Sequence, residues 1–342
     1  MALLEVNDLQ TRFRTDDGIV KAVSGVSFSL EKGETLGVVG ESGSGKSVTF
    51  LTVMGLVDMR HAQVEGSVRF DGQEILGASS SSLQKIRGSR IGMIFQDPMT
   101  SLNPVKRIGW QLEEAVLLHN DVTHAEARRR SVEILQEVEI PRADARIDDY
   151  PHQFSGGMRQ RVMIAMALIN KPEVLIADEP TTALDVTTQA QILRLMRKLQ
   201  DEHEMAIVMI THDLGVVAEL ANDVLVMYGG RVVEQAQVDH LFAKPEMPYT
   251  WGLLGSLPRL NVTSERLEQI PGQPPSLLHP PKGCSFNPRC AYVFDRCRQE
   301  LPELAAGAVG DEHRFRCHLP DEERARIWEA KKAALAAEGS AA

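Results

Sequence analysis

The first 30 residues of the chain alternate between apolar and polar before the apolar runs lengthen. Residues 3–30 alternate on either side of the turn signal Asp17-Gly18, which predicts a small antiparallel sheet. Thr35–Val39 (TLGVV) is a short apolar run typical of a buried strand, and residues 48–56 continue mostly apolar after a glycine-rich segment. The pattern therefore predicts a strand, a loop and a helix in succession, with a further strand pair around residues 66–70.

The middle of the chain changes to helical character. This holds from about residue 98 to residue 160, and within it Thr123 lies three residues before Glu126, the spacing of a capping box at the start of a helix. We expect an inserted helical subdomain here.

Short apolar runs return after that segment. Residues 173–177 and 206–210 predict strands, and a helix is predicted over roughly 187–202 between them. A further strand is predicted at 223–228. Strand, helix and strand in this order are the repeat of a parallel βαβ core, so the expected fold class is α/β.

Beyond about residue 257 the composition shifts to proline and glycine (IPGQPPSLLHPPKG), which neither a helix nor a central strand accommodates. We interpret this stretch as a linker to a separate module. The end, from Asp321, is rich in Ala and Glu and predicts a peripheral helix. The expected domains are residues 1–256, with the helical subdomain at about 98–160, residues 257–320 and residues 321–342.

Length and charge narrow the class of protein. With 342 residues and a net charge of -10, the chain can form one large domain with an appendage, and it has no basic run that would bind nucleic acid. The first residues contain no basic segment followed by an apolar one, and no stretch approaches the roughly 18 apolar residues of a spanning helix. We therefore expect a cytosolic chain whose membrane association depends on partners.

Residues 40–47 (GESGSGKS) fall between the predicted strand and helix. Three glycines, at positions 40, 43 and 45, allow backbone amides to turn inward around phosphate oxygens. Lys46 can reach the β- and γ-phosphates, the Ser47 hydroxyl can ligate Mg²⁺, and the helix N-terminus adds partial positive charge. A glycine-rich turn without a ligand would need neither the lysine nor the serine, so the pattern indicates a P-loop that binds ATP.

The apolar run VLIADEP ends in two acids, whose charge Mg²⁺ can compensate. We expect Asp178 to hold the metal and Glu179 to orient and deprotonate the attacking water. Gln96, after IGMIF, offers an amide oxygen to Mg²⁺ or to that water, and His212, after AIVMIT, could reach the γ-phosphate or fix the water. The alternatives are an acid pair that only caps a turn and a structural histidine.

Ser155-Gly156-Gly157 precede a long apolar helical run, and their amides with the Ser155 hydroxyl form a second candidate anion site. An ordinary serine N-cap followed by glycines is the alternative. One chain thus carries two phosphate-facing helix ends. If a single ATP needs both and they lie far apart in one fold, two chains could supply one each.

Across residues 3–235 these motifs resemble the ATP-binding subunit of an ABC transporter. The resemblance implies an α/β ABC-type P-loop ATPase with an N-terminal antiparallel β subdomain, an inserted helical subdomain and a small C-terminal module that carries the cysteines. It implies that two subunits bind head to tail, with residues 155–158 of one closing over ATP on the P-loop of the other and Ala183-Leu184-Asp185 at the junction. It also suggests that Phe13 stacks on adenine, with a core phenylalanine as the alternative. The family commonly has LSGGQ where this chain has FSGGM, so Met158 cannot make the glutamine's hydrogen bonds.

The predicted site residues form three groups. The catalytic group is Glu179, His212 and Gln96. The magnesium ligands are Ser47, Gln96 and Asp178. The expected nucleotide contacts are Phe13, Gly40, Ser42, Gly43, Ser44, Gly45, Lys46, Ser47, Val48, Ser155, Gly156, Gly157 and Asp185.

The stretches PYTWGLLGSLPRL, IPGQPPSLLHPPKGCSFNPRC and CHLP, with QDPMTSLNP at 96–104, resemble oligopeptide and dipeptide importer ATPases. This implies ATP hydrolysis that powers peptide import at the cytoplasmic face of the inner membrane. The implied partners are two transmembrane permeases, a second related ATP-binding subunit and an extracytoplasmic peptide-binding protein. Relatives that import nickel or glutathione leave the cargo open. A soluble ABC ATPase acting on nucleic acid or ribosomes, and a metal-dependent regulator, are the rivals; the single cassette, the acidic balance and the complete ATP-binding groups disfavour them.

The four cysteines, Cys284, Cys290, Cys297 and Cys317, all follow the proline-rich stretch. Disulfides are disfavoured in the cytosol, so a metal site of four thiolates is the leading interpretation. Zinc sites usually pair ligands two to four residues apart, whereas iron-sulfur ligation tolerates the wider spacings found here. We expect a structural 4Fe-4S cluster that stabilises a module with little core, with zinc or plain reduced cysteines as the alternatives.

Overall fold

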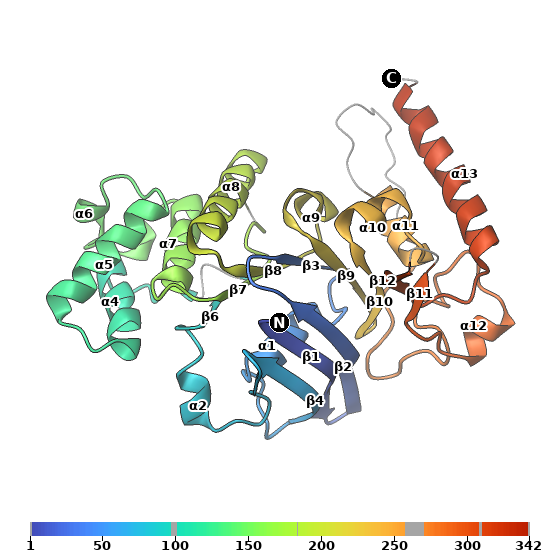
Figure 1. Ribbon diagram of the computed structural model, residues 1–342, viewed down its shortest axis with the longest axis horizontal. Coiled ribbons are helices and arrows are strands. Elements are labelled where there is room, and N and C mark those ends of the chain that lie inside the picture. The colour runs from blue at the N-terminus through green and yellow to red at the C-terminus, as the bar shows by residue number, and fades with distance from the viewer. Residues whose placement is uncertain (1, 97–100, 183, 257–269, 308–309, 341–342) are drawn as a thin grey trace. The chain divides into compact units, whose positions relative to one another are not determined.

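The computed structural model describes residues 2–96, 101–182, 184–256, 270–307 and 310–340 (Figure 1). The chain forms two compact units. The first unit contains residues 1–3, 30–35 and 71–210, and the second contains residues 4–29, 36–70 and 211–342. The mixed α/β architecture, with an antiparallel sheet and a helical subdomain, confirms the predicted fold class.

The antiparallel sheet of the second unit is built from the alternating N-terminal sequence. Strands β1 (Leu4–Thr15), β2 (Gly18–Leu30) and β4 (Ala62–Phe70) lie in the order β2-β1-β4, and the predicted turn joins the first two. Helix α1 (Lys46–Val53) packs on this sheet, where the rings of Phe28 and Phe50 lie 5.5 Å apart.

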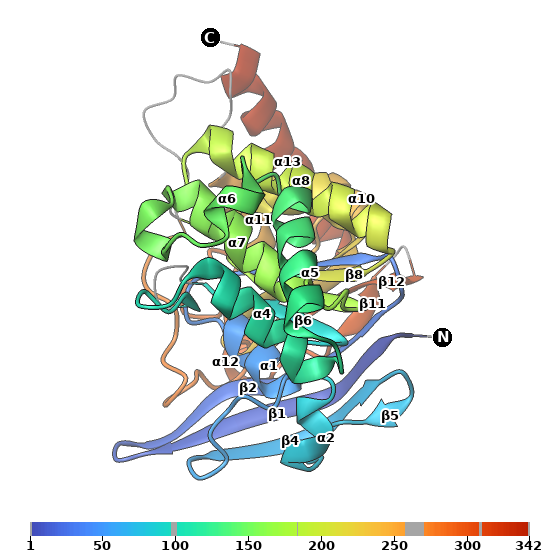
Figure 2. The ribbon, with the colours of Figure 1, turned by 90° about the vertical axis from the view of Figure 1, so that its left-hand side faces the viewer.

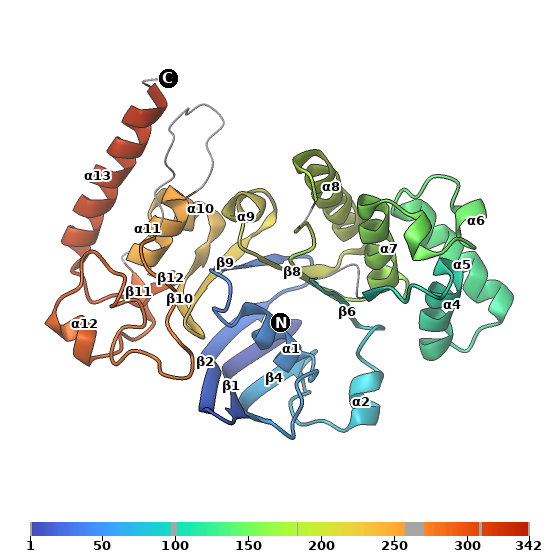
Figure 3. The ribbon, with the colours of Figure 1, turned by 180° about the vertical axis from the view of Figure 1, so that it is seen from behind.

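A mixed sheet in the second unit carries the short apolar strand of the sequence pattern. Strand β3 (Thr35–Val39) pairs parallel with β9 (Asp223–Tyr228), and β9 pairs antiparallel with β10 (Arg231–Gln237). Two strands from the C-terminal region extend it, because β12 (Gly310–Phe315) pairs with β10 and with β11 (Ala305–Gly307) (Figure 3). The predictions for β3 and β9 are confirmed to the residue.

One hydrophobic core joins the C-terminal region to the rest of the second unit. It contains Val39 and Val226 of the central strands together with Trp251, Phe286 and Trp328 from beyond them. The remaining helices of this unit are α9 (Leu214–Leu220), α10 (Val238–Ala243), α11 (Pro248–Gly255), α12 (Asp295–Gln299) and α13 (Asp321–Ser340). The predicted boundary at residue 257 lies outside the described residues, and the domain limits stay a prediction.

The first unit contains the predicted βαβ repeat. Strands β6 (Ile91–Ile94), β7 (Val174–Asp178) and β8 (Ala206–Thr211) pair in parallel, with β7 in the middle, and α8 (Val186–His203) connects β7 to β8. Two short elements of the same unit precede β6: β5 (Gln73–Glu74) and α2 (Ser80–Gln84).

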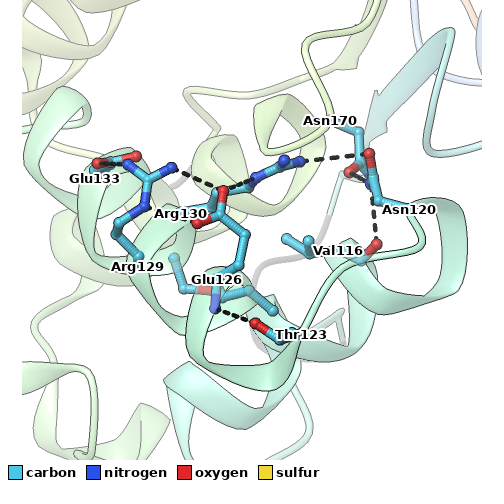
Figure 4. A network of polar contacts seen from close by, with 10 residues as sticks. Val116, Asn120, Thr123, Glu126, Arg129, Arg130, Glu133 and Asn170 are labelled. Atoms are coloured by element: carbon cyan, nitrogen blue, oxygen red, sulfur yellow. Dashed lines mark hydrogen bonds and ion pairs between the residues drawn. The ribbon is translucent and has the colours of Figure 1, made fainter.

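The predicted helical subdomain also lies in the first unit and faces the viewer in Figure 2. Its elements are α4 (Ile108–His119), α5 (His124–Glu137), α6 (Ala143–Arg146), the 3-10 helix η1 (Pro151–Gln153) and α7 (Gly156–Leu168). Asn120, after α4, donates to Asn170, after α7, over 2.9 Å and so fixes the ends of these two helices together (Figure 4).

The predicted capping box of α5 forms only in part. The Thr123 hydroxyl accepts from the backbone N–H of Glu126 at 3.2 Å, as the pattern requires. The Glu126 carboxylate turns instead toward the guanidinium groups of Arg129 and Arg130, at 2.7 and 2.8 Å (Figure 4). Two charged partners one turn further along compete successfully for the carboxylate.

None of the helices in the described residues is long and apolar enough to cross a bilayer.

Candidate functional site

The loop between β3 and α1 requires glycine at two positions. Gly40 has φ 152° and Gly45 has φ 101°, values that side-chain-bearing residues rarely adopt. A Cβ atom on Gly40 would lie 2.2 Å from the Met227 carbonyl oxygen, and one on Gly45 would lie 2.5 Å from the Ala22 carbonyl oxygen. The backbone can approach these neighbours only because both side chains are absent.

The polar groups of this loop are arranged for an anion. The Lys46 ammonium is buried, with 5 % of the residue exposed, and donates to the carbonyl oxygens of Gly40 at 2.7 Å and Glu41 at 3.0 Å. The Ser44 hydroxyl is buried and has no hydrogen-bond partner among the residues that the structure describes. Ser47 lies in the first turn of α1, where backbone N–H groups are unsatisfied and the dipole is positive. The loop therefore fits a phosphate group, which would occupy the lysine and the unpaired hydroxyl.

The P-loop has a buried arginine as a neighbour that sequence reasoning missed. Arg289 donates to both carboxylate oxygens of Glu41, at 2.5 and 2.9 Å, and Tyr249 accepts from the Glu41 backbone N–H at 2.9 Å. Arg289 lies 248 positions from Glu41. No local sequence pattern connects residues so far apart, so the contact becomes visible only in the folded structure.

The first unit brings together two of the predicted catalytic residues at the ends of its strands. Asp178 is the last residue of β7 and is 4 % exposed. Glu179 follows with φ 49° and donates its N–H to the Ile210 carbonyl oxygen at 2.8 Å. Its carboxylate accepts from the Gln96 amide nitrogen at 3.1 Å. This contact fixes the amide nitrogen of Gln96 beside Glu179.

A second residue holds the same carboxylate. The Thr182 hydroxyl donates to Glu179 at 2.9 Å, on the oxygen that Gln96 also contacts. Thr182 was not predicted; the only signal in the sequence is its position three residues after Glu179. The held carboxylate has the chemistry of a base for a water molecule.

The remaining predicted catalytic and metal residues lie on the second unit. His212 follows β8 directly and its side chain is exposed, and Ser47 is half-buried. Oxygen ligands of the kind carried by Ser47, Gln96 and Asp178 are those that Mg²⁺ prefers. Their assignment to one metal ion stays a prediction.

The second predicted anion site is the N-terminus of α7. Ser155 caps the helix by accepting from the Met158 N–H at 3.3 Å, and both Ser155 and Gly156 are exposed. A Cβ atom on Gly156 would meet nothing within 4 Å, whereas one on Gly157 would lie 2.8 Å from the Thr188 methyl group of α8. The end of α7 is therefore open to a ligand on one side and packed against α8 on the other.

Asp185 caps α8 beside this helix end. Its carboxylate accepts from the Thr188 backbone N–H at 3.0 Å and from the Thr188 hydroxyl at 2.7 Å. These two bonds hold the pKa of Asp185 below its usual value, and the backbone bond has the larger effect. The carboxylate is therefore ionised at neutral pH. Ala183, predicted at the same junction, lies outside the described residues.

Phe13 and Val48 are half-buried, Phe13 on β1 opposite Ala62 of β4 and Val48 on α1. Half-burial leaves part of the Phe13 ring able to contact a ligand. Ser42 and Gly43 are exposed at the tip of the P-loop. Of the predicted stretch 96–104, residues 97–100 lie outside the described residues.

The four cysteines lie within electrostatic range of one another in the second unit. Burial raises the pKa of Cys284 and of Cys290 to about 11 and that of Cys317 to about 12, and the neighbouring thiols raise each further. Among the described residues, no three Cys, His, Asp or Glu side chains are close enough to hold a metal ion. The four sulfurs are thus neighbours that do not converge on one ion.

Two protein-family models match separate segments of the sequence. Residues 23–182 match the family model for the ABC transporter, and residues 233–297 match that for the oligopeptide/dipeptide transporter, C-terminal region. The solved dimeric cassette MJ0796 bound to ADP and Pi is 28% identical, with a TM-score of 0.62 over 69% of this chain and 98% of that chain. The class that fold and site define is therefore the ABC-type ATP-binding cassette.

Sequence relatives extend over most of the chain. The oligopeptide transport ATP-binding protein OppD of Haemophilus influenzae is 53% identical over 88% of this chain and 93% of its own. OppD of Bacillus subtilis is 49% identical over 97% and 94%, and the dipeptide transport ATP-binding protein DppD of Lactococcus lactis is 55% identical over 88% and 86%. The chain belongs to the family of oligopeptide and dipeptide transport ATP-binding proteins of ABC transporters, which confirms the resemblance seen in the sequence.

Proposed function

We propose that this protein hydrolyses ATP to power the import of oligopeptides or dipeptides through an ABC transporter. The observation that carries the proposal is the P-loop, in which glycine is sterically required, Lys46 is buried and the Ser44 hydroxyl is unpaired. Family membership supports the peptide cargo. Importers of nickel or glutathione remain the alternative within the same mechanism.

The proposed chemistry assigns one role to each held group. Loop amides and Lys46 bind the phosphate oxygens and neutralise their charge. Glu179, held by Gln96 and Thr182, orients the attacking water and accepts its proton. Ser47, Asp178 and Gln96 would hold Mg²⁺, which stabilises charge on the phosphates. His212 would steady the γ-phosphate or the water.

We propose further that ATP is closed between two subunits. The open, serine-capped end of α7 suits a γ-phosphate held by another chain, and Asp185 lies beside it to contact the partner. Supporting this, the similar cassette MJ0796 is described as a dimer with ADP and Pi. The partner would be a second, related ATP-binding subunit.

The rest of the assembly follows from the same proposal. Two transmembrane permeases would carry the cargo, an extracytoplasmic peptide-binding protein would deliver it, and this chain would sit peripherally on the cytoplasmic face of the inner membrane. The helical subdomain, with the segment near Gln96, would receive the permeases. The acidic net charge of -10 disfavours a nucleic-acid partner.

For the cysteines we propose a structural 4Fe-4S cluster. A single tetrahedral zinc ion would draw its four sulfurs to roughly 3.8 Å from one another, because each Zn–S bond is about 2.3 Å. A four-iron cluster takes one thiolate on each iron and so accepts more widely separated ligands. Three of the thiols, those of Cys284, Cys290 and Cys317, have raised pKa values and need a nearby cation to ionise, which the cluster would provide.

Replacing the proposed base tests the hydrolytic assignment. Glu179→Gln should lower the ATPase rate of the assembled transporter by about 10²–10⁴-fold, because the water loses its proton acceptor, while ATP affinity is kept. Lys46→Ala is the matched contrast, since it should weaken binding instead. Parental hydrolysis by Glu179→Gln would remove Glu179 from the mechanism.

Iron content tests the cluster. Anaerobically purified protein should absorb visible light and contain about four iron atoms per chain, and Cys290→Ser should lose both. Zinc or a metal-free chain in the parental protein would refute the assignment.

A further inference from the structure

A buried ion pair connects the P-loop to the cysteine-bearing region, by which we mean residues 284–317. The Arg289 side chain is 4 % exposed and lies next to Cys290 in the sequence. Its two terminal nitrogens grip both carboxylate oxygens of Glu41, the second residue of the P-loop, at 2.5 and 2.9 Å. Two parallel hydrogen bonds of this kind fix direction as well as distance.

Arg289 is itself held in place from the other side. Its Nε donates to the Pro271 carbonyl oxygen at 2.8 Å, and its Nη2 donates to the Ile270 carbonyl oxygen at 3.2 Å. The Tyr228 hydroxyl lies 3.4 Å from Nη1. With these donors occupied, the guanidinium cannot swing away, so Glu41 is tied to a fixed point.

The same short stretch of backbone holds Lys46, the lysine proposed to bind the phosphates. Tyr249, fully buried against Tyr228 and Phe286, accepts from the Glu41 N–H at 2.9 Å. The Glu41 carbonyl oxygen in turn accepts from Lys46 at 3.0 Å. Side chain, N–H and carbonyl of Glu41 are therefore all engaged, and two of the three partners come from the C-terminal part of the chain.

We propose that Arg289 is a positioning residue for ATP binding, which holds the P-loop through Glu41 so that Lys46 meets the phosphates. This rests on the proposed ATPase function and adds to it a dependence of ATP affinity on the cysteine-bearing region. Any disturbance that displaces Cys284 to Cys290 displaces Arg289 and loosens the loop. The cysteine region thus acts as a support for nucleotide binding.

A double-mutant cycle on the full-length chain tests the proposal. Arg289→Ala and Glu41→Ala should each weaken binding of a fluorescent ATP analogue by about tenfold, and the double variant should be no weaker than either single one. In the assembled transporter, saturating ATP should restore hydrolysis by Arg289→Ala to the parental rate, because positioning acts on affinity. Arg289→Lys keeps the charge but not the paired geometry, so its ATP affinity should lie between those of the parental chain and Arg289→Ala.

Arg324→Ala is the matched control, because Arg324 is also a buried arginine, 2 % exposed, paired with Glu246 at 2.7 Å in the same unit. It should lower the melting temperature and leave ATP affinity within about twofold. If Arg289→Ala fails to fold, Glu41→Gln removes the charge with little change of volume and should weaken binding in the same direction. Parental affinity in both Glu41→Gln and Arg289→Lys, or an equal loss in Arg324→Ala, would overturn the proposal. Failure of the parental chain to bind ATP would instead refute the proposed function.

Discussion

The N-termini of α1 and α7 are both glycine-flanked and both suited to phosphate, yet they are built differently. At α1, Gly45 has no side-chain cap, and the loop before it is enclosed by Met227, Ala22 and the pair of Glu41 and Arg289. At α7, Ser155 caps its own helix and is exposed, and there is open space beside Gly156. One site is completed within its own unit, whereas the other leaves room for a group from outside.

The difference between the two helix ends predicts that one governs ATP binding and the other governs ATP hydrolysis. A preformed, enclosed loop should bind ATP in the isolated subunit, since little ordering remains to be done on binding. An exposed helix end adds affinity only when a second chain presents a phosphate to it. Substitutions at the two helix ends should therefore affect different measurements.

The largest effect is expected at the enclosed end. Gly45→Ala would put a methyl group 2.5 Å from a backbone oxygen, so the loop must shift, and ATP affinity of the isolated subunit should fall by at least about 100-fold. Titration with a fluorescent ATP analogue measures it. Gly33→Ala is the control, because Gly33 also has positive φ, 77°, but open space around it. Equal losses in both variants would mean that backbone strain alone, and not the enclosure, is responsible.

A smaller and later effect is expected at the open end. Ser155→Ala should leave ATP binding by the isolated subunit unchanged and lower hydrolysis by the assembled transporter about tenfold or more, as expected when a hydrogen bond to a charged group is lost. Thr123→Ala removes the equivalent cap from α5, at a similar cost of about 1 kcal/mol in stability, without touching the site. The contrast between the helix ends breaks down if Thr123→Ala slows hydrolysis as much.

The smallest effect is expected beside Ser155. Met158→Gln supplies the side chain that the family commonly has there, and one added neutral hydrogen bond should raise the ATP affinity of the assembled dimer about two- to fivefold. Met158→Leu, which remains apolar, should change nothing. ATP dependence of the hydrolysis rate measures both, and an unchanged Met158→Gln would show that backbone contacts suffice at this end.

Local patterns predicted the elements well because their causes are local. The apolar run at β3 and the glycines at 40 and 45 act within a few residues, and the structure has them where the sequence placed them. The capping box predicted for α5 forms only in part. Thr123 accepts the predicted backbone hydrogen bond, whereas the Glu126 carboxylate pairs with neighbouring arginines instead of the helix end. Competition among charges is not visible in spacing alone.

Contacts between distant segments could not be predicted. The addition of β12 to β10 and the pairing of Arg289 with Glu41 depend on which surfaces the folded chain brings together. Thr182 was missed for a related reason, because a threonine near a carboxylate is too common a pattern to indicate a hydrogen bond. Motifs in the sequence were enough to propose which residues bind ATP, whereas the residues that contact and hold those candidates were not predicted.

The pairing of β3 with β9 also sets a delay during synthesis, because the two strands are far apart in the sequence. Leu36 of β3 pairs with Asp223 of β9, so a ribosome adding about 5–20 residues per second delivers that neighbour roughly 10–40 s after the strand itself. Strands β6, β7 and β8 with the helical subdomain occupy one continuous stretch and can collapse first. During that interval the edge of β3 that pairs with β9 has no partner, and termination of synthesis before residue 223 would leave that edge open to pairing with another chain.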